Sequence, residues 1–389
     1  MSVAFLLCWR FGTLVGVSRR AEVILALFGF VFHVIFGMAY LLVPSYFGTV
    51  LATDRLPVVH LGSSVSGTIL LALSASAVGP PSVETVGALL WGCGVGVFIA
   101  ALLWSVGDEL RRGETGTSTH RAKFEWVDRY ANRFIPVAFA YLAIGAYELV
   151  ARSTALPGLT DGYFPRITHL LAAGFAALLV FTLGVRLAPR FLGVPAPKEL
   201  TAVVLPAGAL GPVLIAFGLS SGSVFVAGAL AEATAFICFA ALYLVVYFRS
   251  ERRRVGAESI LAGVGSGVAG VSIGLTVAAG PLFDSSPVPA GALSAHLQLN
   301  LLGFLGLVVV GFAFLFYPPT AGRFRGATAR TARMAIAVLV VGLTISVVGR
   351  LAGWSVLSSF GDGVVLLGAI GYGYLLIRLL VEIGARQAT

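Results

Sequence analysis

Two histidines in apolar segments are the residues of this sequence best suited to chemistry. His169 stands in the stretch "RITHLLAAGF" and His296 in "LSAHLQLNLLGF". At a rise of ~1.5 Å per residue, His296 lies about one turn inside its expected span, below the depth of the lipid headgroups. An imidazole at that depth needs a partner, and a metal ion or a haem iron is a natural one. A hydrogen bond to a neighbouring helix is the alternative.

Two amide side chains follow His296 on the same expected helix. Positions 296 and 298 lie about 200° apart at 100° per residue, so His296 and Gln298 point to opposite faces and can serve two sites that flank one helix. Asn300 lies one turn after His296 on the same face, where it can hold the imidazole in place. We therefore count Gln298 and Asn300, with His296 and His169, as candidate cofactor-binding residues.

One acidic residue also falls in an apolar run. Glu232 lies in the middle of "AGALAEATAF", where a bare carboxylate is costly, so its side chain is expected to be protonated, paired or hydrated. The functional interpretation is a proton relay or an ion site. The structural interpretation is a neutral carboxyl that is hydrogen-bonded to a neighbouring helix.

The composition requires membrane-spanning helices to position these residues. Of the 389 residues, 58% are hydrophobic and 11% are charged, with a mean hydropathy of +0.97, which is too apolar for a soluble chain of this length. The sequence predicts an all-α membrane protein with one helical domain over 22–389, preceded by an interfacial or partly inserted segment over 1–21. Eleven spans are expected near 22–43, 57–78, 86–106, 133–153, 166–188, 201–219, 223–247, 258–280, 292–316, 331–349 and 360–381.

Charge and cysteine usage narrow the class further. The net charge of +9 is typical of loops that contact the headgroups of the lipid bilayer and does not indicate a nucleic-acid partner. The three cysteines form no CxxC or CxxCH motif, so neither a thiolate metal site nor covalently attached haem is expected.

The distribution of basic residues predicts the orientation. Of 26 lysines and arginines, 20 lie in or beside the connections after spans 1, 3, 5, 7 and 9 and at the C-terminus. Only six lie on the opposite side. Because basic residues gather in cytoplasmic loops, the C-terminus is expected in the cytoplasm and the N-terminus outside, in the plasma membrane.

An internal repeat of the form G-F-x13-P-x3-G occurs three times. It begins at Gly29, Gly174 and Gly303, at separations of 145 and 129 residues, and each copy opens about four spans. The chain is therefore predicted to contain three pseudo-repeated units, near 22–153, 166–280 and 292–381, with the last unit one helix short. His33 is a weaker metal candidate, because it lies half a turn out of phase with the direction that His169 takes in the second unit.

The segment around His296 resembles the tenth helix of subunit I of haem-copper oxidases. It is similar in its A-H-x-H order, with Gln298 in place of the second histidine, and in the glycine, proline and glycine that follow at Gly311, Pro318 and Gly322. The stretch T-H-x4-G-F from Thr168 also resembles segments of NnrS-type haem- and copper-associated membrane proteins. The resemblance implies twelve-helix architecture in three arcs, with the first helix missing or reduced to the N-terminal segment.

The resemblance implies a b-type haem held by His296, with His169 as a second ligand or a neighbouring metal ligand. It also implies several losses. Gln298 stands where the second haem would be bound, Ile24 stands near its other ligand position, and span 6 lacks the paired histidines of a copper site. Copper is therefore not expected, since it prefers several imidazoles, and the ligand set of an oxygen- or nitric-oxide-reducing enzyme is incomplete.

The leading hypothesis is thus a haem-binding membrane protein with a redox role or a role in handling O2 or NO, served by an electron donor or another respiratory subunit. Whether it is an enzyme, an oxidoreductase of that type, stays open. A small-molecule transporter, with His296, Asn300, His169 and Glu232 lining a cavity, is the first alternative. A cofactor-free structural subunit of a respiratory complex is the second.

Overall fold

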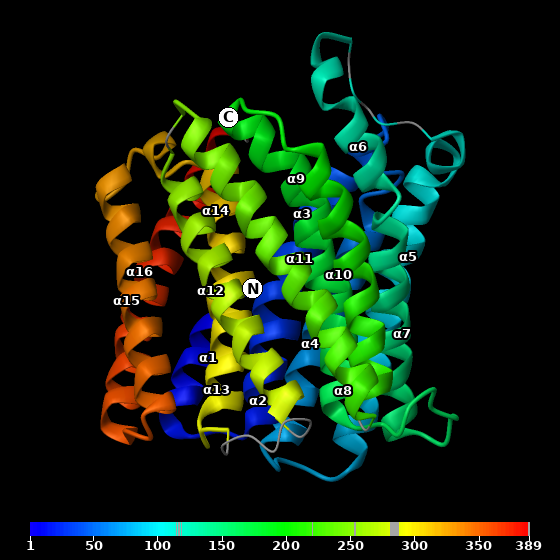
Figure 1. Cartoon of the computed structure of the whole chain (residues 1–389), viewed down its shortest axis with the longest axis vertical. Helices are drawn as coiled ribbons and strands as arrows, with labels where there is room; N and C mark the ends of the chain where they lie inside the picture. Colours follow the sequence, from blue (N-terminus) through cyan, green and yellow to red (C-terminus); the bar gives the residue numbers. More distant parts are fainter. Residues whose placement is uncertain are drawn as a thin grey trace.

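Long apolar helices that run roughly alongside one another form the body of the molecule in the computed structural model (Figure 1). The structure describes residues 1–113, 115, 117, 119–219, 221–252, 254–280 and 288–387, and no strand occurs among them. In the labels of Figure 1, η1, η3 and η5 are π-helical segments, and η2 and η6 are short 3-10 helices.

The elements, in chain order, are α1 (Ser2–Val15), α2 (Arg19–Val23), η1 (Ile24–Val31), α3 (Phe32–Tyr46), α4 (Arg55–Ala75), α5 (Ser82–Arg112), η2 (Thr119–Phe124), α6 (Glu125–Asn132), α7 (Ile135–Ser153), α8 (Phe164–His169), η3 (Leu170–Ala177), α9 (Leu178–Leu192), α10 (Lys198–Gly218), α11 (Gly222–Arg249), α12 (Val255–Ala279), α13 (Ala292–Gln298), η5 (Leu299–Gly306), α14 (Leu307–Phe316), η6 (Pro319–Ala321), α15 (Ala329–Leu351) and α16 (Ser355–Gln387).

The prediction of eleven spans is confirmed for the described residues. Eleven helices are long and apolar enough to cross a membrane, and each overlaps one predicted span. Several helices continue beyond the apolar window. The third predicted span, 86–106, belongs to a helix that runs from Ser82 to Arg112 and ends at Gly113, whose φ of 71° only glycine adopts easily. Polar residues can extend a helix without adding to its apolar stretch, so the helix is longer than the span predicted from hydrophobicity.

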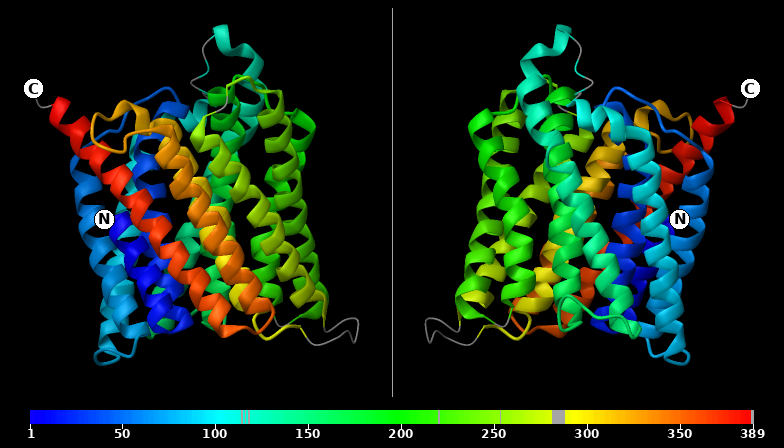
Figure 2. Two further views of the ribbon diagram at one scale, coloured as in Figure 1. Left: turned by 90° about the vertical axis from the view of Figure 1, so that its left-hand side faces the viewer. Right: turned by 90° about the vertical axis from the view of Figure 1, so that its right-hand side faces the viewer.

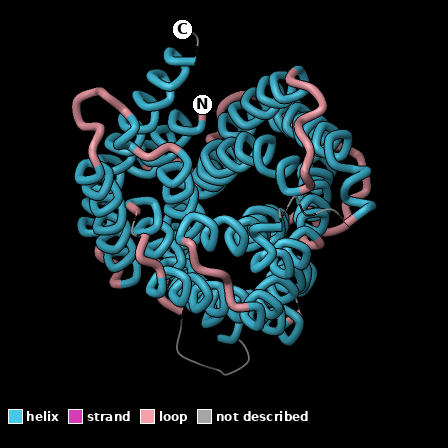
Figure 3. Tube along the Cα trace, turned by 90° about the horizontal axis from the view of Figure 1, so that it is seen from above, coloured by secondary structure: helices cyan, strands magenta, loops and turns pink. Residues whose placement is uncertain are grey.

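Three spans form the centre of the bundle. They run over Arg19–Tyr46, Phe164–Leu192 and Ala292–Ala321, and 72–83% of the most apolar stretch of each is buried, against 56% or less in the other eight. Their middle segments touch, because η5 contacts both η1 and η3. Seen end-on, the helices form a bundle of roughly round outline (Figure 3). The three central spans are the ones that open the sequence repeat.

Each repeated glycine lies in a π-helical segment and allows close packing. A Cβ atom on Gly29 would lie 2.6 Å from the Phe5 ring. A Cβ on Gly174 would lie 2.5 Å from the Tyr141 ring, and one on Gly303 would lie 2.5 Å from Ser266. These separations are shorter than any van der Waals contact. At each of the three positions, therefore, glycine allows a neighbouring side chain to approach the helix backbone closely.

The N-terminal segment forms a short helix inside the bundle. Helix α1 has 14 residues, about 21 Å at ~1.5 Å per residue, which is less than the ~30 Å hydrocarbon core. It packs against η1 and α16, and the side chains of Leu6, Trp9 and Arg10 are almost inaccessible. The chain begins about halfway up the bundle and reaches its lower end before turning into α2 (Figures 1 and 2).

The two ends of the bundle differ in what they carry. Helices α2, α8 and α13 lie at the lower end in Figure 1, whereas α6 and the C-terminus lie at the upper end. The side views show the same arrangement (Figure 2). His169 ends α8 and His296 lies within α13, so both predicted ligands occupy the same end of the molecule.

Candidate functional site

A cavity of about 560 Å³ lies between the central helices at this end, which is within the usual size range of small-molecule sites. Its walls come from α2, α8, η3, α10, α11, α12, α13 and η5. Apolar and small side chains make up most of the lining. The polar residues that share it are Arg19, Arg20, Tyr163, Thr168, His169, Glu232, His296 and Asn300.

His296 faces the cavity with one ring nitrogen already bonded. Its Nδ1 lies 2.8 Å from the carbonyl oxygen of Gly270 on α12. A carbonyl can only accept, so in the neutral ring Nδ1 carries the hydrogen and Nε2 presents a lone pair. The ring lies against Gly274, where a Cβ atom would come within 2.8 Å of Cε1. Nε2 has no hydrogen-bond partner among the described residues and is available to a ligand.

His169 is arranged in the same way. Its Nδ1 lies 2.7 Å from the carbonyl oxygen of Pro165, one turn earlier on α8. This contact assigns the hydrogen to Nδ1 in the neutral ring, as in His296, and leaves the Nε2 lone pair without a partner in the described part of the chain. The cavity thus holds two imidazoles, from different thirds of the chain, that are both prepared to bind a metal through Nε2.

Asn300 supports His296 from one turn further along the helix. Its Nδ2 donates to the His296 carbonyl oxygen at 2.8 Å and lies 3.3 Å from His296 Nδ1. Asn300 also packs against Gly270, where a Cβ atom would lie 2.7 Å from the amide nitrogen. Asn300 therefore lines the cavity beside the imidazole, on the helix face that the i, i+4 spacing predicts, and its amide is bonded to the backbone carbonyl of His296.

Glu232 reaches the same cavity from α11. Its side chain is 5% exposed, and neither carboxyl oxygen has a hydrogen-bond partner among the described residues. Among the described residues, Glu232 has neither a charged partner nor the hydrogen bond to a neighbouring helix that the structural interpretation expects. A buried carboxyl without a partner costs free energy, and such groups are commonly found where a ligand binds.

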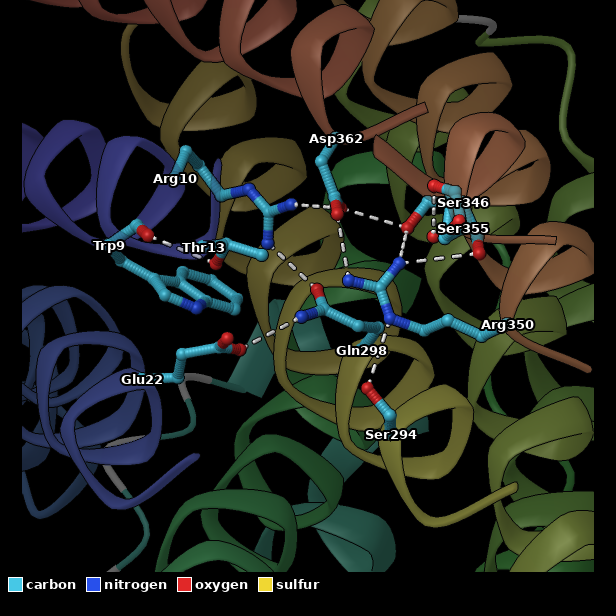
Figure 4. A network of polar contacts seen from close by, with 11 residues as sticks. Trp9, Arg10, Thr13, Glu22, Ser294, Gln298, Ser346, Arg350, Ser355 and Asp362 are labelled. Atoms are coloured by element: carbon cyan, nitrogen blue, oxygen red, sulfur yellow. Dashed lines mark hydrogen bonds and ion pairs between the residues drawn. The ribbon is translucent and has the colours of Figure 1, made fainter. Parts of the chain in front are cut away.

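Gln298 does not line the cavity. It is 2% exposed and faces away from His296, into a charged network that joins α1, α13, α15 and α16 (Figure 4). Arg10 Nη1 donates to Gln298 Oε1 at 2.8 Å, and Gln298 Nε2 donates to Glu22 at 3.3 Å. Residues 296 and 298 point to opposite faces of the helix, as expected. The face of Gln298 carries this charged network in place of a second binding site.

The network reaches α15 and α16 through Arg350 and Asp362. Arg10 Nη2 and Arg350 Nη2 each donate to Asp362, at 2.8 Å in both cases. Arg350 Nε also donates to Ser294 Oγ at 3.0 Å. Because Ser294 and Gln298 lie two residues before and two after His296, the network holds α13 from the side opposite to the cavity (Figure 4).

The remaining histidines lie elsewhere. His33 Nδ1 contacts the carbonyl oxygens of Phe28 and Gly29, at 2.9 and 2.8 Å, and Ser64 Oγ lies 3.3 Å from Nε2. His33 does not line the cavity. The side chain of His120 lies outside the described residues. Within the described chain, no group of three His, Cys, Asp or Glu side chains could hold a metal ion.

Two arginines of the cavity wall were not among the residues predicted to bind a ligand. Arg19 is exposed and Arg20 is partly buried, so the cavity reaches the surface near the start of α2. Arg20 is ion-paired with Glu84 and stacks over Phe164 at 5.2 Å. The sequence did contain a sign of their role, because two adjacent arginines lie at the outer end of an apolar span. The count of basic residues used them only to predict the orientation of the chain.

The loop before α8 fixes the start of the helix that carries His169. The Asp161 carboxylate accepts a hydrogen bond from the Tyr163 N–H at 3.0 Å and another from Arg166 Nε at 3.0 Å. These two contacts, the backbone one first, hold the pKa of Asp161 below its ordinary value. The carboxylate is therefore charged at neutral pH and keeps its place at the end of the helix.

These features define a class: a polytopic helical membrane protein with a ligand-sized cavity between its central helices. No protein-family model matches the chain, and no curated protein matches it either. The cavity and the residues that line it are therefore the features that point to a function.

Proposed function

We propose that this protein binds haem b in the cavity shared by His169 and His296. The observation that carries the proposal is the pair of imidazoles, each bonded at Nδ1 to a backbone carbonyl and each with an unpartnered Nε2 on the same cavity. His296 would be the principal ligand of the iron, and His169 would be a second ligand or a neighbouring metal ligand. Neutral imidazole with its other nitrogen fixed is the usual form of a metal-binding histidine.

The other lining residues suit the group. The walls are mostly apolar, as a porphyrin ring requires, with aromatic side chains from Phe164, Phe225, Phe236 and Phe304. Arg19 and Arg20 line the part that reaches the surface, where their positive charge complements the two carboxylates of haem b. A haem would thus place its iron toward the imidazoles and its acidic groups toward the arginines.

A bound haem supplies an iron that can change oxidation state and bind a small ligand such as O2 or NO. The protein residues hold the group, orient it and exclude water from it. The proposed role is redox or small-gas handling, with an electron donor or another respiratory subunit as partner. Kinship with haem-copper oxidase subunit I is part of the proposal, and its support is the sequence resemblance around His296.

Absorption spectroscopy of the purified protein tests the proposal. We expect a Soret band in the reduced-minus-oxidised spectrum, its loss in His296→Ala, and a weakened or shifted band in His169→Ala. His33→Ala is the matched control, because it removes an intramembrane histidine that does not line the cavity. A preparation supplied with haem that shows no Soret band, or a band that both cavity variants leave unchanged, contradicts the proposal.

A transporter of small molecules is the second candidate. Its support is that the four polar residues predicted to line a transport cavity, His296, Asn300, His169 and Glu232, do share one cavity. Uptake of a substrate into proteoliposomes by a haem-free preparation, and its loss in Glu232→Gln, would favour this function over the first.

A further inference from the structure

Glu232 is the acidic residue of the cavity lining, and the proposed haem ligation does not use it. It comes from α11, the side of the cavity that carries no histidine, and it lies among Ala229, Phe225 and Phe236. Its two carboxyl oxygens are buried and have no partner in the described part of the chain. A polar side chain this deeply buried without a partner points to a ligand that is absent from the structure.

The fold makes specific room for this side chain. A Cβ atom on Gly211 of α10 would lie 2.6 Å from Glu232 Cγ and 2.8 Å from Oε1, so only glycine leaves the space that the carboxyl occupies. The Tyr141 hydroxyl of α7 donates to the Ala209 carbonyl oxygen at 2.5 Å and not to Glu232. No hydroxyl of the described residues donates to the Glu232 carboxyl, which lines the cavity.

The surroundings decide the form of the carboxyl. An ionised carboxylate without a donor in an apolar interior costs several kcal/mol, whereas the neutral acid costs much less. The other titratable or charged groups of the cavity are Tyr163, His169, His296, Arg19 and Arg20, and none of them pairs with Glu232. Glu232 is thus a neutral acid whose O–H is a donor, and a ligand in the cavity is the acceptor available to it.

We infer that Glu232 is a hydrogen-bond donor to the small ligand in this cavity and selects ligands that carry negative charge when bound, such as fluoride or O2, over the weakly polar CO. The inference rests on the proposed haem site. A hydrogen-bond donor that reaches an iron-bound ligand stabilises that ligand in proportion to its charge, which is how the surroundings of a haem set its ligand preference. No bond is broken, and the proton stays on the Glu232 carboxyl.

Ligand titration of the haem-loaded protein, followed by absorption, tests the inference. We compare Glu232→Leu, which removes the donor, with Glu232→Gln, which keeps one in the amide. Glu148→Gln is the matched control, since Glu148 is a buried carboxyl that is bonded to the Leu159 and Thr160 amides away from the cavity. A hydrogen bond to a charged ligand corresponds to about a tenfold or larger change in affinity.

The expected result is a fluoride affinity that falls about tenfold or more in Glu232→Leu, is largely kept in Glu232→Gln, and is unchanged in Glu148→Gln, with CO affinity constant throughout. Infrared difference spectra of the wild type, with and without fluoride, should show a shift of a protonated carboxyl band that both Glu232 variants lack. This measurement decides the matter even if Glu232→Leu does not fold.

The two proposals fail in different ways. A wild-type protein that takes up no haem overturns the proposed function and this inference with it. Normal haem and CO binding with fluoride affinity unchanged in Glu232→Leu, or no carboxyl shift in the wild type, overturns this inference alone.

Discussion

At the scale of single residues, the cavity depends as much on glycines as on histidines. His296 has its orientation because Gly270 supplies a carbonyl oxygen and Gly274 leaves room for the ring. Glu232 has its place because Gly211 lacks a side chain. The functional groups are thus positioned by residues that carry no chemistry themselves, which is common where helices approach closely in a membrane.

Replacing Gly274 tests this dependence. Gly274→Ala is expected to displace the His296 ring and to lower haem content at least severalfold, because the new Cβ atom would lie 2.8 Å from Cε1. Gly265→Ala on the same helix is the control, since nothing lies within 4 Å of its Cβ position. Haem-to-protein ratios from absorption measure both variants. Equal ratios would show that Gly274 does not shape the site.

At the scale of elements, a buried charge network attaches the short helix α1 to the bundle. Arg10 is 0% exposed, and it joins Gln298 of α13 to Asp362 of α16 (Figure 4). A helix too short to span a membrane offers less apolar surface than a full span, so the hydrogen bond to Gln298 and the ion pair with Asp362 supplement its packing. The same contacts restrain α13, which carries His296.

Replacing Arg10 should lower the free energy of unfolding by more than breaking an ion pair at the surface does. Arg10→Met leaves Asp362 and Gln298 buried with one donor fewer, and we expect a loss of about 3 kcal/mol in the free energy of unfolding. The control, Arg333→Met, breaks an ion pair with Glu258 that is largely exposed and should cost less than ~1 kcal/mol. Thermal unfolding in detergent compares them. Similar losses in the two variants would contradict a stabilising role for the network.

At the scale of the whole molecule, the cavity and the positive charge lie toward opposite ends. The helices that carry His169 and His296 lie at the lower end in Figure 1, and the C-terminus lies at the upper end. If basic residues mark the cytoplasm, the cavity lies near the outer surface of the membrane. A ligand or an electron donor would then approach from outside.

Cysteine labelling tests this orientation. In a chain with its three cysteines replaced by serine, Leu156→Cys lies in the exposed loop after α7, and Ala385→Cys lies near the C-terminal end of α16. A membrane-impermeant maleimide applied to intact cells is expected to label Leu156→Cys only, and a permeant one should label both. Labelling of Ala385→Cys alone by the impermeant reagent would reverse the orientation.

Much of the architecture followed from local patterns in the chain. The eleven spans were predictable because hydrophobicity over about 20 residues is a property of each segment alone. The pairing of His296 with Asn300 was predictable because residues four apart share a helix face. The motif G-F-x13-P-x3-G also singled out the three spans that the structure places at the centre.

Other features depended on contacts that no local pattern records. Arg10 is 352 residues from Asp362 and 288 from Gln298, so neither the burial of α1 nor the partner of Gln298 could be read from spacing. The convergence of His169, His296 and Glu232 on one cavity, and the absence of a partner for Glu232 in the described chain, were decided by helix packing. The hydrophobicity of a segment determines whether it enters the membrane. It contains almost no information on which helices the segment packs against, because lipid and protein interior are similarly apolar.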